Sequence, residues 1–487
     1  MEQNDVTISV FSNIFWRFAE RCGAQLVAFI VSVILARLLS PDDYGTIALI
    51  AVFITILQVF VDSGLGNALI QKKDADDLDF STVFFTNIIF CFILYICIFI
   101  CAPVISAFYN RPELAPYIRV LGLTVLISGV KNVQQAYVSR NLLFKHFFFA
   151  TLGGTITAAI IGIAMAYHGF GVWALVVQQV INLSIDTLIL WRSVKWRPQM
   201  KFSFQRLKRL YSFGWKLLAS SLLNTAYSNI RQLIIGKIYS TTDLAYYNQG
   251  EIFPSVVVTN INSSIDSVLL PTMSKVQDDR EHIKNMTRHA IKVSTYIMAP
   301  MMMGLAFTAE PLISLSLTEK WLPCVPFLRI FCITYMFYPI HSANLNAIKA
   351  MGRSDLFLKL EIIKKVVGIV LLFSTIWFGV MAMVYSLLVD NICSQIINSW
   401  PNRKLLNYRY MEQLKDILPS ILLAVGMGVV VYGISGLNLP LPITFSIQIL
   451  LGAIIYVMGS IIFKMDAFVY LCETISPIFS KNHKADM

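Results

Sequence analysis

Basic and amide side chains, with one glutamate among them, recur along one face of two long apolar segments of this chain. In residues 8–39 the stripe consists of Arg17, Glu20, Arg21 and Gln25. In residues 211–239 it consists of Lys216, Asn224 and Arg231. At about 100° per residue, each set falls on one side of a helix. Arg and Lys bind carboxylates and phosphates through charge-assisted hydrogen bonds, so the chemistry these residues indicate is binding of an anion.

Two explanations account for charges inside apolar segments. A charge at the centre of a bilayer costs about 2.5–3.5 kcal/mol, so such groups face protein or water. They could join helices through salt bridges and hydrogen bonds, as an Arg17–Glu20 pair would. They could instead line a hydrated cationic cavity. The surplus of cations on both segments favours the cavity, because unpaired cations in a low dielectric are costly without an anionic ligand.

Three acidic residues in apolar segments are candidates for coupling or gating. Asp62 ends the apolar segment at residues 43–62, and Glu251 and Asp266 share a narrow polar face of residues 244–271. Carboxylates at such depth usually mark a pathway. No catalytic residue, metal site or cofactor is expected. The eight cysteines form no CxxC pair, and no GxxxxGK[ST] phosphate loop occurs.

Composition places the chain in the membrane. Apolar residues make up 56% of the 487 residues and charged residues 14%, against about 25% charged in soluble domains. The predicted fold is an all-α polytopic membrane protein with about fourteen transmembrane helices of about 20 residues each. These spans are placed at residues 8–39, 43–62, 80–109, 113–138, 149–168, 170–191, 211–239, 244–271, 289–317, 325–349, 356–379, 380–399, 416–436 and 443–463.

Basic residues predict the orientation of these spans. The net charge is +11, and Lys and Arg concentrate in the loops that follow even-numbered spans, especially residues 192–209, 275–288 and 403–415. Cytoplasmic loops carry such an excess, so both termini are expected in the cytoplasm. The basic loops are explained by orientation and contact with lipid headgroups, and nucleic acid is not an expected partner.

A segment of the sequence recurs about 200 residues later. Residues 36–45, ARLLSPDDYG, match residues 236–245, GKIYSTTDLA, and each copy joins two long apolar segments. Weak internal symmetry of this kind is typical of transporters built from two related lobes, with the binding site between the lobes. Duplication also occurs in channels and in some membrane enzymes.

Five motifs carry a resemblance to a known family: residues 36–45, residues 62–71 (DSGLGNALIQ), residues 169–175 (GFGVWAL), residues 235–237 leading to residues 246–248, and residues 319–321. On these motifs the chain resembles the polysaccharide transport family of bacterial lipid-linked oligosaccharide flippases. That family belongs to the exporter superfamily that also contains the multidrug and toxin extrusion proteins and the lipid II flippase. The resemblance implies two pseudo-symmetric six-helix lobes in a V shape and two extra C-terminal helices. It also implies passage of an undecaprenyl-diphosphate-linked glycan from cytoplasm to periplasm.

The resemblance and the span pattern together predict a division of the chain. The expected parts are an N-lobe (1–191), a basic cytoplasmic linker (192–210), a C-lobe (211–399), a cytoplasmic loop (400–415), two extra spans (416–463) and a cytoplasmic tail (464–487). Expected partners are the lipid-linked glycan, membrane lipids, and a polysaccharide polymerase with its chain-length machinery. The expected location is the bacterial inner membrane.

Two rival functions follow from the same pattern. A cation-coupled multidrug antiporter would need an acid-dominated cavity, whereas Arg and Lys outnumber Glu20 on the two stripes. A membrane polysaccharide polymerase or ligase would be expected to present a long outer loop with acidic, His or Arg groups for glycosyl transfer. The predicted outer loops are short and nearly uncharged, so the sequence favours a transporter that is not an enzyme.

Overall fold

The computed structural model describes residues 16, 20, 23–62, 65–72, 74–437 and 439–473. Throughout these ranges the regular elements are helices. By contacts between residues the chain divides into two compact units, Met1–Ala245 and Tyr246–Met487.

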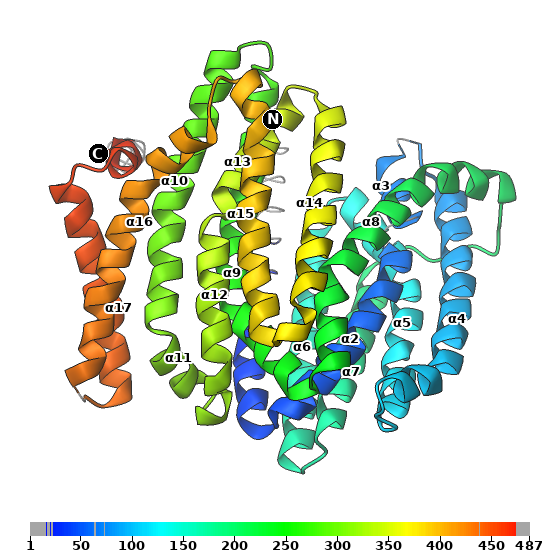
Figure 1. Ribbon diagram of the computed structural model, residues 1–487. Coiled ribbons are helices and arrows are strands. Elements are labelled where there is room, and N and C mark those ends of the chain that lie inside the picture. The colour runs from blue at the N-terminus through cyan, green and yellow to red at the C-terminus, as the bar shows by residue number, and fades with distance from the viewer. Residues whose placement is uncertain are drawn as a thin grey trace, which may run out of the picture. The chain divides into compact units, whose positions relative to one another are not determined.

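The first unit consists of helices joined by short connections (Figure 1). Its first continuously described helix is the apolar helix Gly23–Leu38. It is followed by α2 (Pro41–Asp62), α3 (Leu65–Gln71), α4 (Asp77–Phe108), α5 (Leu114–Arg140), α6 (Phe144–Tyr167), α7 (Val172–Ser193) and α8 (Phe204–Ile238). Gly171, between α6 and α7, has φ +53°, a conformation that glycine adopts without steric cost. The chain can therefore reverse direction there in very few residues.

The second unit begins within α9 (Thr241–Ser274). Its further helices are α10 (Arg280–Phe307), α11 (Ala309–Ser316), η1 (Glu319–Cys324), α12 (Val325–Met336), α13 (Tyr338–Ala350), α14 (Ser354–Thr375), η2 (Ile376–Phe378), α15 (Val380–Leu405), α16 (Tyr410–Gly433), η3 (Ile434–Leu437) and α17 (Leu441–Ile462). Figure 1 shows α16 and α17, in orange and red, as neighbouring helices. A core of this unit joins α9, α13 and α16 through buried Leu269, Ile340 and Ile417.

The helices confirm the prediction of an all-α membrane protein. Within the described ranges, ten segments are long and apolar enough to cross a membrane. The helices α8, α9 and α14 are as long but are not among these ten segments. The count of about fourteen spans therefore stays a prediction. The expected span at 325–349 is divided into α12 and α13, because Pro339 at the start of α13 cannot continue the helix before it.

The repeated sequence forms the same local structure in both copies. The backbone N–H of Asp43 donates to the Ser40 hydroxyl at 3.2 Å, at the start of α2. The backbone N–H of Asp243 donates to the Ser240 hydroxyl at 3.0 Å, at the start of α9. Both hydroxyls donate in turn to the Asp side chain at 2.6 Å. A Ser–Asp pair of this kind satisfies N–H groups that a helix start leaves without partners. The two copies therefore begin their helices by the same device.

The basic segment between α7 and α8 packs against helices of the first unit, to which it belongs. The indole of Trp196 is buried and donates to Asp77 at 3.1 Å. The side-chain amide of Gln134 donates to the Trp196 carbonyl at 3.1 Å. At the start of α8, Arg206 forms ion pairs with Asp76 and with Asp79, the latter at 3.3 Å. The division by contacts falls after Ala245, and the predicted division into lobes at residues 192–210 stays a prediction.

Candidate functional site

The structure describes part of the two predicted cationic stripes. Arg17 and Arg21 lie outside the described residues, and so does the side chain of Lys216. Glu20 accepts a hydrogen bond from the Thr151 hydroxyl of α6 at 3.4 Å. The remaining stripe residues are exposed or half-buried: Gln25 and Asn224 are exposed, and Arg231 is half-buried.

The helix Gly23–Leu38, which holds Gln25, and α8, which holds Asn224 and Arg231, both contact α2. The Tyr44 hydroxyl donates to the carbonyl of Ser32, in helix Gly23–Leu38, at 3.2 Å. On α8, Gly236 lies so close to α2 that a β-carbon there would be 2.9 Å from the side chain of Leu49. One unit therefore holds the first helix and α8, the two helices predicted to line the anion site.

The predicted coupling residue Asp62 belongs to a polar cluster of the first unit. The Asn132 amide of α5 donates to Asp62 at 3.4 Å, and the Asn87 amide of α4 donates to the Asn132 oxygen at 3.4 Å. One residue away, Lys131 and Asp186 form an ion pair of 2.5 Å between side chains that are 11% and 10% exposed. These groups tie α2, α4, α5 and α7 together at one level.

The other two predicted coupling residues connect α9 to the divided helix of the second unit. The Tyr335 hydroxyl of α12 donates to Glu251 at 2.5 Å. On α13, the Asn346 amide donates to Asp266 at 2.7 Å, and the Ser342 hydroxyl donates to the same oxygen. The carboxylates thus hold α9 on both sides of the break between α12 and α13. A change in the charge of either would alter how α9 is attached.

An ion-paired cluster joins the starts of α2 and α9. Arg111, which follows α4, donates to the two Asp42 oxygens at 3.0 and 2.7 Å. Thr241 donates to Asp42 and accepts from Arg111. Arg111 also holds Glu113 at 2.6 Å, and that hydrogen bond lowers the pKa of the Glu113 carboxyl. We call Asp42, Arg111 and Thr241 the connector cluster. The two copies of the repeat therefore touch directly.

A network of buried amides in the second unit is absent from the sequence prediction. The Asn344 amide donates to Gln413 at 2.8 Å, and the Asn402 amide donates to the Asn344 oxygen at 2.6 Å. His341 is enclosed by Asn391 and Asn398, at 3.3 and 2.9 Å from its two ring nitrogens. Each ring nitrogen of His341 therefore has a hydrogen-bonding partner within the second unit. Polar residues inside the apolar segments at 338–350 and 391–402 were the available signal.

Two relatives of known process match most of the chain. The chain is 23% identical over 441 residues to the teichuronic acid biosynthesis protein TuaB of Bacillus subtilis (strain 168), covering 88% of this chain and 90% of that protein. It is 24% identical over 345 residues to the succinoglycan biosynthesis transport protein ExoT of Rhizobium meliloti (strain 1021). That match covers 71% of this chain and 70% of ExoT.

The fold matches that of a solved membrane transporter. The inward closed conformation of the lipid II flippase MurJ superposes with a TM-score of 0.75 and 17% identity, covering 93% of this chain and all (100%) of that one. At this identity the likeness concerns the fold alone. The sequence match to a family model is more specific: residues 34–326 fit the family described as polysaccharide biosynthesis protein. The chain is thus a multi-pass membrane protein that belongs to the polysaccharide biosynthesis protein family.

Proposed function

We propose that this protein is a flippase that carries undecaprenyl-diphosphate-linked oligosaccharides from the cytoplasmic to the periplasmic leaflet. The glycans are repeat units of O-antigen, capsule or exopolysaccharide. Two properties of the chain together carry the proposal. The chain belongs to a polysaccharide biosynthesis family, and over 93% of its length it has the fold of a lipid II flippase.

The chemistry of the stripe residues supports an anionic, sugar-bearing substrate. A lipid-linked diphosphate sugar has an anionic head, a polar glycan and an apolar tail. The guanidinium of Arg231 offers a planar pair of donors that suits phosphate oxygens. Glu20 and Asn224 supply acceptors and donors for sugar hydroxyls. In the proposed site Arg17, Arg21 and Lys216 add to the cationic field, and Asp62, Glu251 and Asp266 act in coupling or gating.

Transport then proceeds by alternating access, with the connector cluster as a contact that closes one side. Asp42 and Thr241 come from the two copies of the repeat and contact each other. Two states of a transporter can interconvert when the contacts that close each side differ by only a few kcal/mol. In the predicted orientation, the contact between Asp42 and Thr241 lies on the periplasmic side of the membrane and both termini lie in the cytoplasm. The proposed partner that receives the glycan is a polysaccharide polymerase.

A reconstitution experiment tests the proposal. Purified protein in liposomes is given a lipid-linked oligosaccharide in the inner leaflet, and the glycan that reaches the outer leaflet is measured with an external glycosidase. We expect transfer without any change in glycan length. Elongated glycan would identify a polymerase or ligase instead, and cation-driven dye efflux without glycan transfer would identify a drug antiporter.

The site prediction is tested separately with Arg231→Ala. We expect this variant to reach normal levels in the membrane and to lose glycan transfer, because the diphosphate loses a bidentate partner. Lys404→Ala is the matched control, since Lys404 is an exposed cation at the end of α15 and should transfer glycan normally. Full activity of the Arg231 variant would remove Arg231 from the site while leaving the flippase proposal standing.

A further inference from the structure

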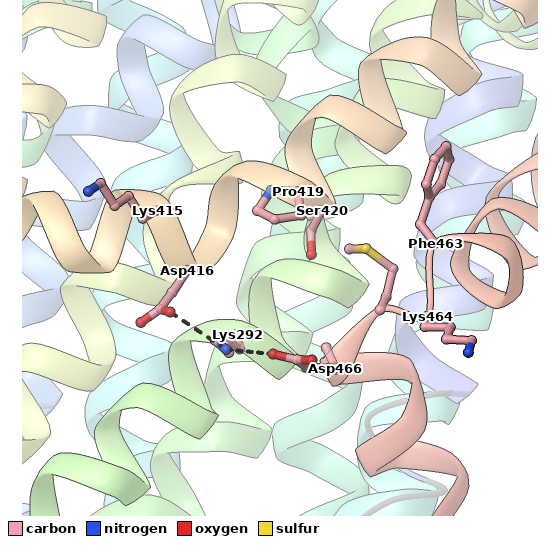
Figure 2. Close-up of a pocket in the computed structure, with 10 residues that line it drawn as sticks. Lys292, Lys415, Asp416, Pro419, Ser420, Phe463, Lys464 and Asp466 are labelled. Atoms are coloured by element: carbon pink, nitrogen blue, oxygen red, sulfur yellow. Dashed lines mark hydrogen bonds and ion pairs between the residues drawn. The ribbon is translucent and has the colours of Figure 1, made fainter.

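A pocket in the second unit gathers more basic than acidic side chains. It has a volume of about 270 Å³ and lies where α10, α16 and the segment after α17 meet (Figure 2). Its charged lining residues are Lys292, Lys415, Asp416, Lys464 and Asp466. None of these residues belongs to the proposed transport site, and binding in this pocket does not require the chain to move a glycan.

The two carboxylates of the pocket differ in how firmly they are held. The Asp416 side chain is 6% exposed and accepts from Nε and Nη2 of Arg288, each at 2.7 Å, and from the Tyr408 hydroxyl at 2.7 Å. Asp466 is 82% exposed and pairs with Lys292 at 3.0 Å, and Asp416 lies 3.6 Å from the same ammonium group. An exposed ion pair contributes little free energy. Lys292 can therefore exchange Asp466 for another anion, whereas Asp416 stays in place.

Two further lysines stand at the edges of the pocket. Figure 2 shows Lys292 between the two carboxylates, with Lys415 on α16 to one side and Lys464 after α17 to the other. Lys415 and Lys464 are exposed and form no ion pair within the part of the chain that the structure describes. Both side chains are long and flexible enough to turn towards a bound anion. The pocket thus offers an anion three ammonium groups.

One rim of the pocket is apolar. Phe463, directly after α17, lines it and is 71% exposed, and the last two residues of α17, Ile461 and Ile462, are 53% and 67% exposed. Spans end at the level where acyl chains meet phosphate groups, and in the predicted orientation this end of α17 faces the cytoplasm. An apolar rim beside a basic pocket fits a ligand that joins an anion to an apolar tail, whereas a free phosphate would leave the rim unused.

We propose that this pocket binds the headgroup of an anionic phospholipid, with the phosphate on Lys292, Lys415 and Lys464 and the acyl chains along the end of α17. Basic clusters beside membrane spans attract anionic lipids by charge, and the pocket adds a fixed position. In this arrangement the lipid displaces Asp466 from Lys292.

Native mass spectrometry of the full chain in detergent, titrated with phosphatidylglycerol or phosphatidylcholine, tests the site. We expect the wild type to bind phosphatidylglycerol more tightly than phosphatidylcholine. The double variant Lys415→Gln with Lys464→Gln should bind it about thirtyfold more weakly, since each basic group near the surface contributes about fivefold. The control is Arg403→Gln with Lys404→Gln, which removes the same charge from exposed residues outside the pocket. The control should bind as the wild type does.

A second variant separates binding from a structural role. Asp466→Asn removes the competing carboxylate and should tighten phosphatidylglycerol binding severalfold, whereas Glu473→Gln, on the same short helix, should not. Equal losses in both double variants would mean that overall charge attracts the lipid, and the site would be refuted. Weaker binding by Asp466→Asn would also refute it. Competition by inorganic phosphate at the same concentration as the lipid would show a site for free phosphate, and the lipid would be excluded.

Discussion

The contact between the two copies of the repeat should depend on the absence of a side chain at Gly45. Gly45 lies near the start of α2, and a β-carbon placed there would be 1.7 Å from the carbonyl oxygen of Thr241 at the start of α9. The obstacle is main chain, so no side-chain rotation relieves it. The replacement Gly45→Ala therefore has to move the starts of α2 and α9 apart by about 1 Å or more.

The size of the effect follows from what this movement disturbs. Overpacking costs about 1–3 kcal/mol. The hydrogen bonds of Thr241 to Asp42 and Arg111 also weaken, and at a partly exposed site this adds about 1 kcal/mol. A total of about 2–4 kcal/mol against the closed contact shifts a two-state equilibrium by about 30- to 1,000-fold. In a helix without such a neighbour, Gly→Ala would instead stabilise by about 0.5–1 kcal/mol.

The measurement uses one cysteine in each connector, Pro41→Cys and Thr242→Cys. In the parent protein a short reducible cross-linker should join them efficiently, and the joined protein should stop transferring glycan until it is reduced. With Gly45→Ala the cross-linked fraction should fall sharply. Gly304→Ala is the control, since Gly304 lies inside α10 with open space at its β-carbon position.

Two outcomes would refute this reasoning. Unchanged cross-linking in Gly45→Ala, together with a melting temperature as high as that of the Gly304→Ala control, would show that the two helix starts do not touch. A cross-linked protein that transfers glycan at the normal rate would show that separation of the connectors is not part of transport.

Three further predictions concern orientation, a buried ion pair and pH. A cysteine at Tyr167, the last residue of α6 and 72% exposed, should react with a membrane-impermeant label from outside the cell. A cysteine at Lys404 should react only after the membrane is opened. Removing one partner of the buried Lys131–Asp186 pair, as in Asp186→Ala, should cost about 3–5 kcal/mol in thermal unfolding, and the double variant Lys131→Met with Asp186→Leu should recover most of it. The hydrogen bond from Arg206 lowers the pKa of Asp76 to about 2, below the value of about 3.9 expected in an unfolded chain. The stabilisation by this contact should therefore be complete above about pH 4 and be lost as the pH falls through about 2. Trp196 fluorescence should report the loss of this stabilisation at low pH. The Arg206→Gln variant, which lacks the contact with Asp76, should show the same change in fluorescence already at neutral pH.

The apolar segments and the helix starts follow from local sequence. Hydropathy alone predicts the apolar spans, since a helix in lipid satisfies its own backbone hydrogen bonds and its lipid-facing side chains must be apolar. The Ser–Asp pairs at the two repeat copies cap their helices through residues three positions apart. The break between α12 and α13 also has a local cause in Pro339. Such features need only neighbours along the chain.

The candidate site was predictable only in part. The stripes on the first helix and on α8 are visible in the sequence, because helical periodicity places their residues on one face. Which groups those residues meet is not visible. Asp266 was predicted as a coupling or gating residue, but its attachment to Ser342 and Asn346 joins positions about 80 residues apart.

The sequence by itself determined the helices, their apolar character and the repeat. Tertiary structure decided the pairings between distant residues: Asp42 with Arg111 and Thr241, and Asn344 with Asn402 and Gln413. The physical reason is that helix formation and membrane insertion depend on short stretches of chain, whereas a polar group between helices is stabilised by whichever partner packing brings within about 3 Å. That partner is fixed by how the helices cross, and no short segment of sequence contains that information.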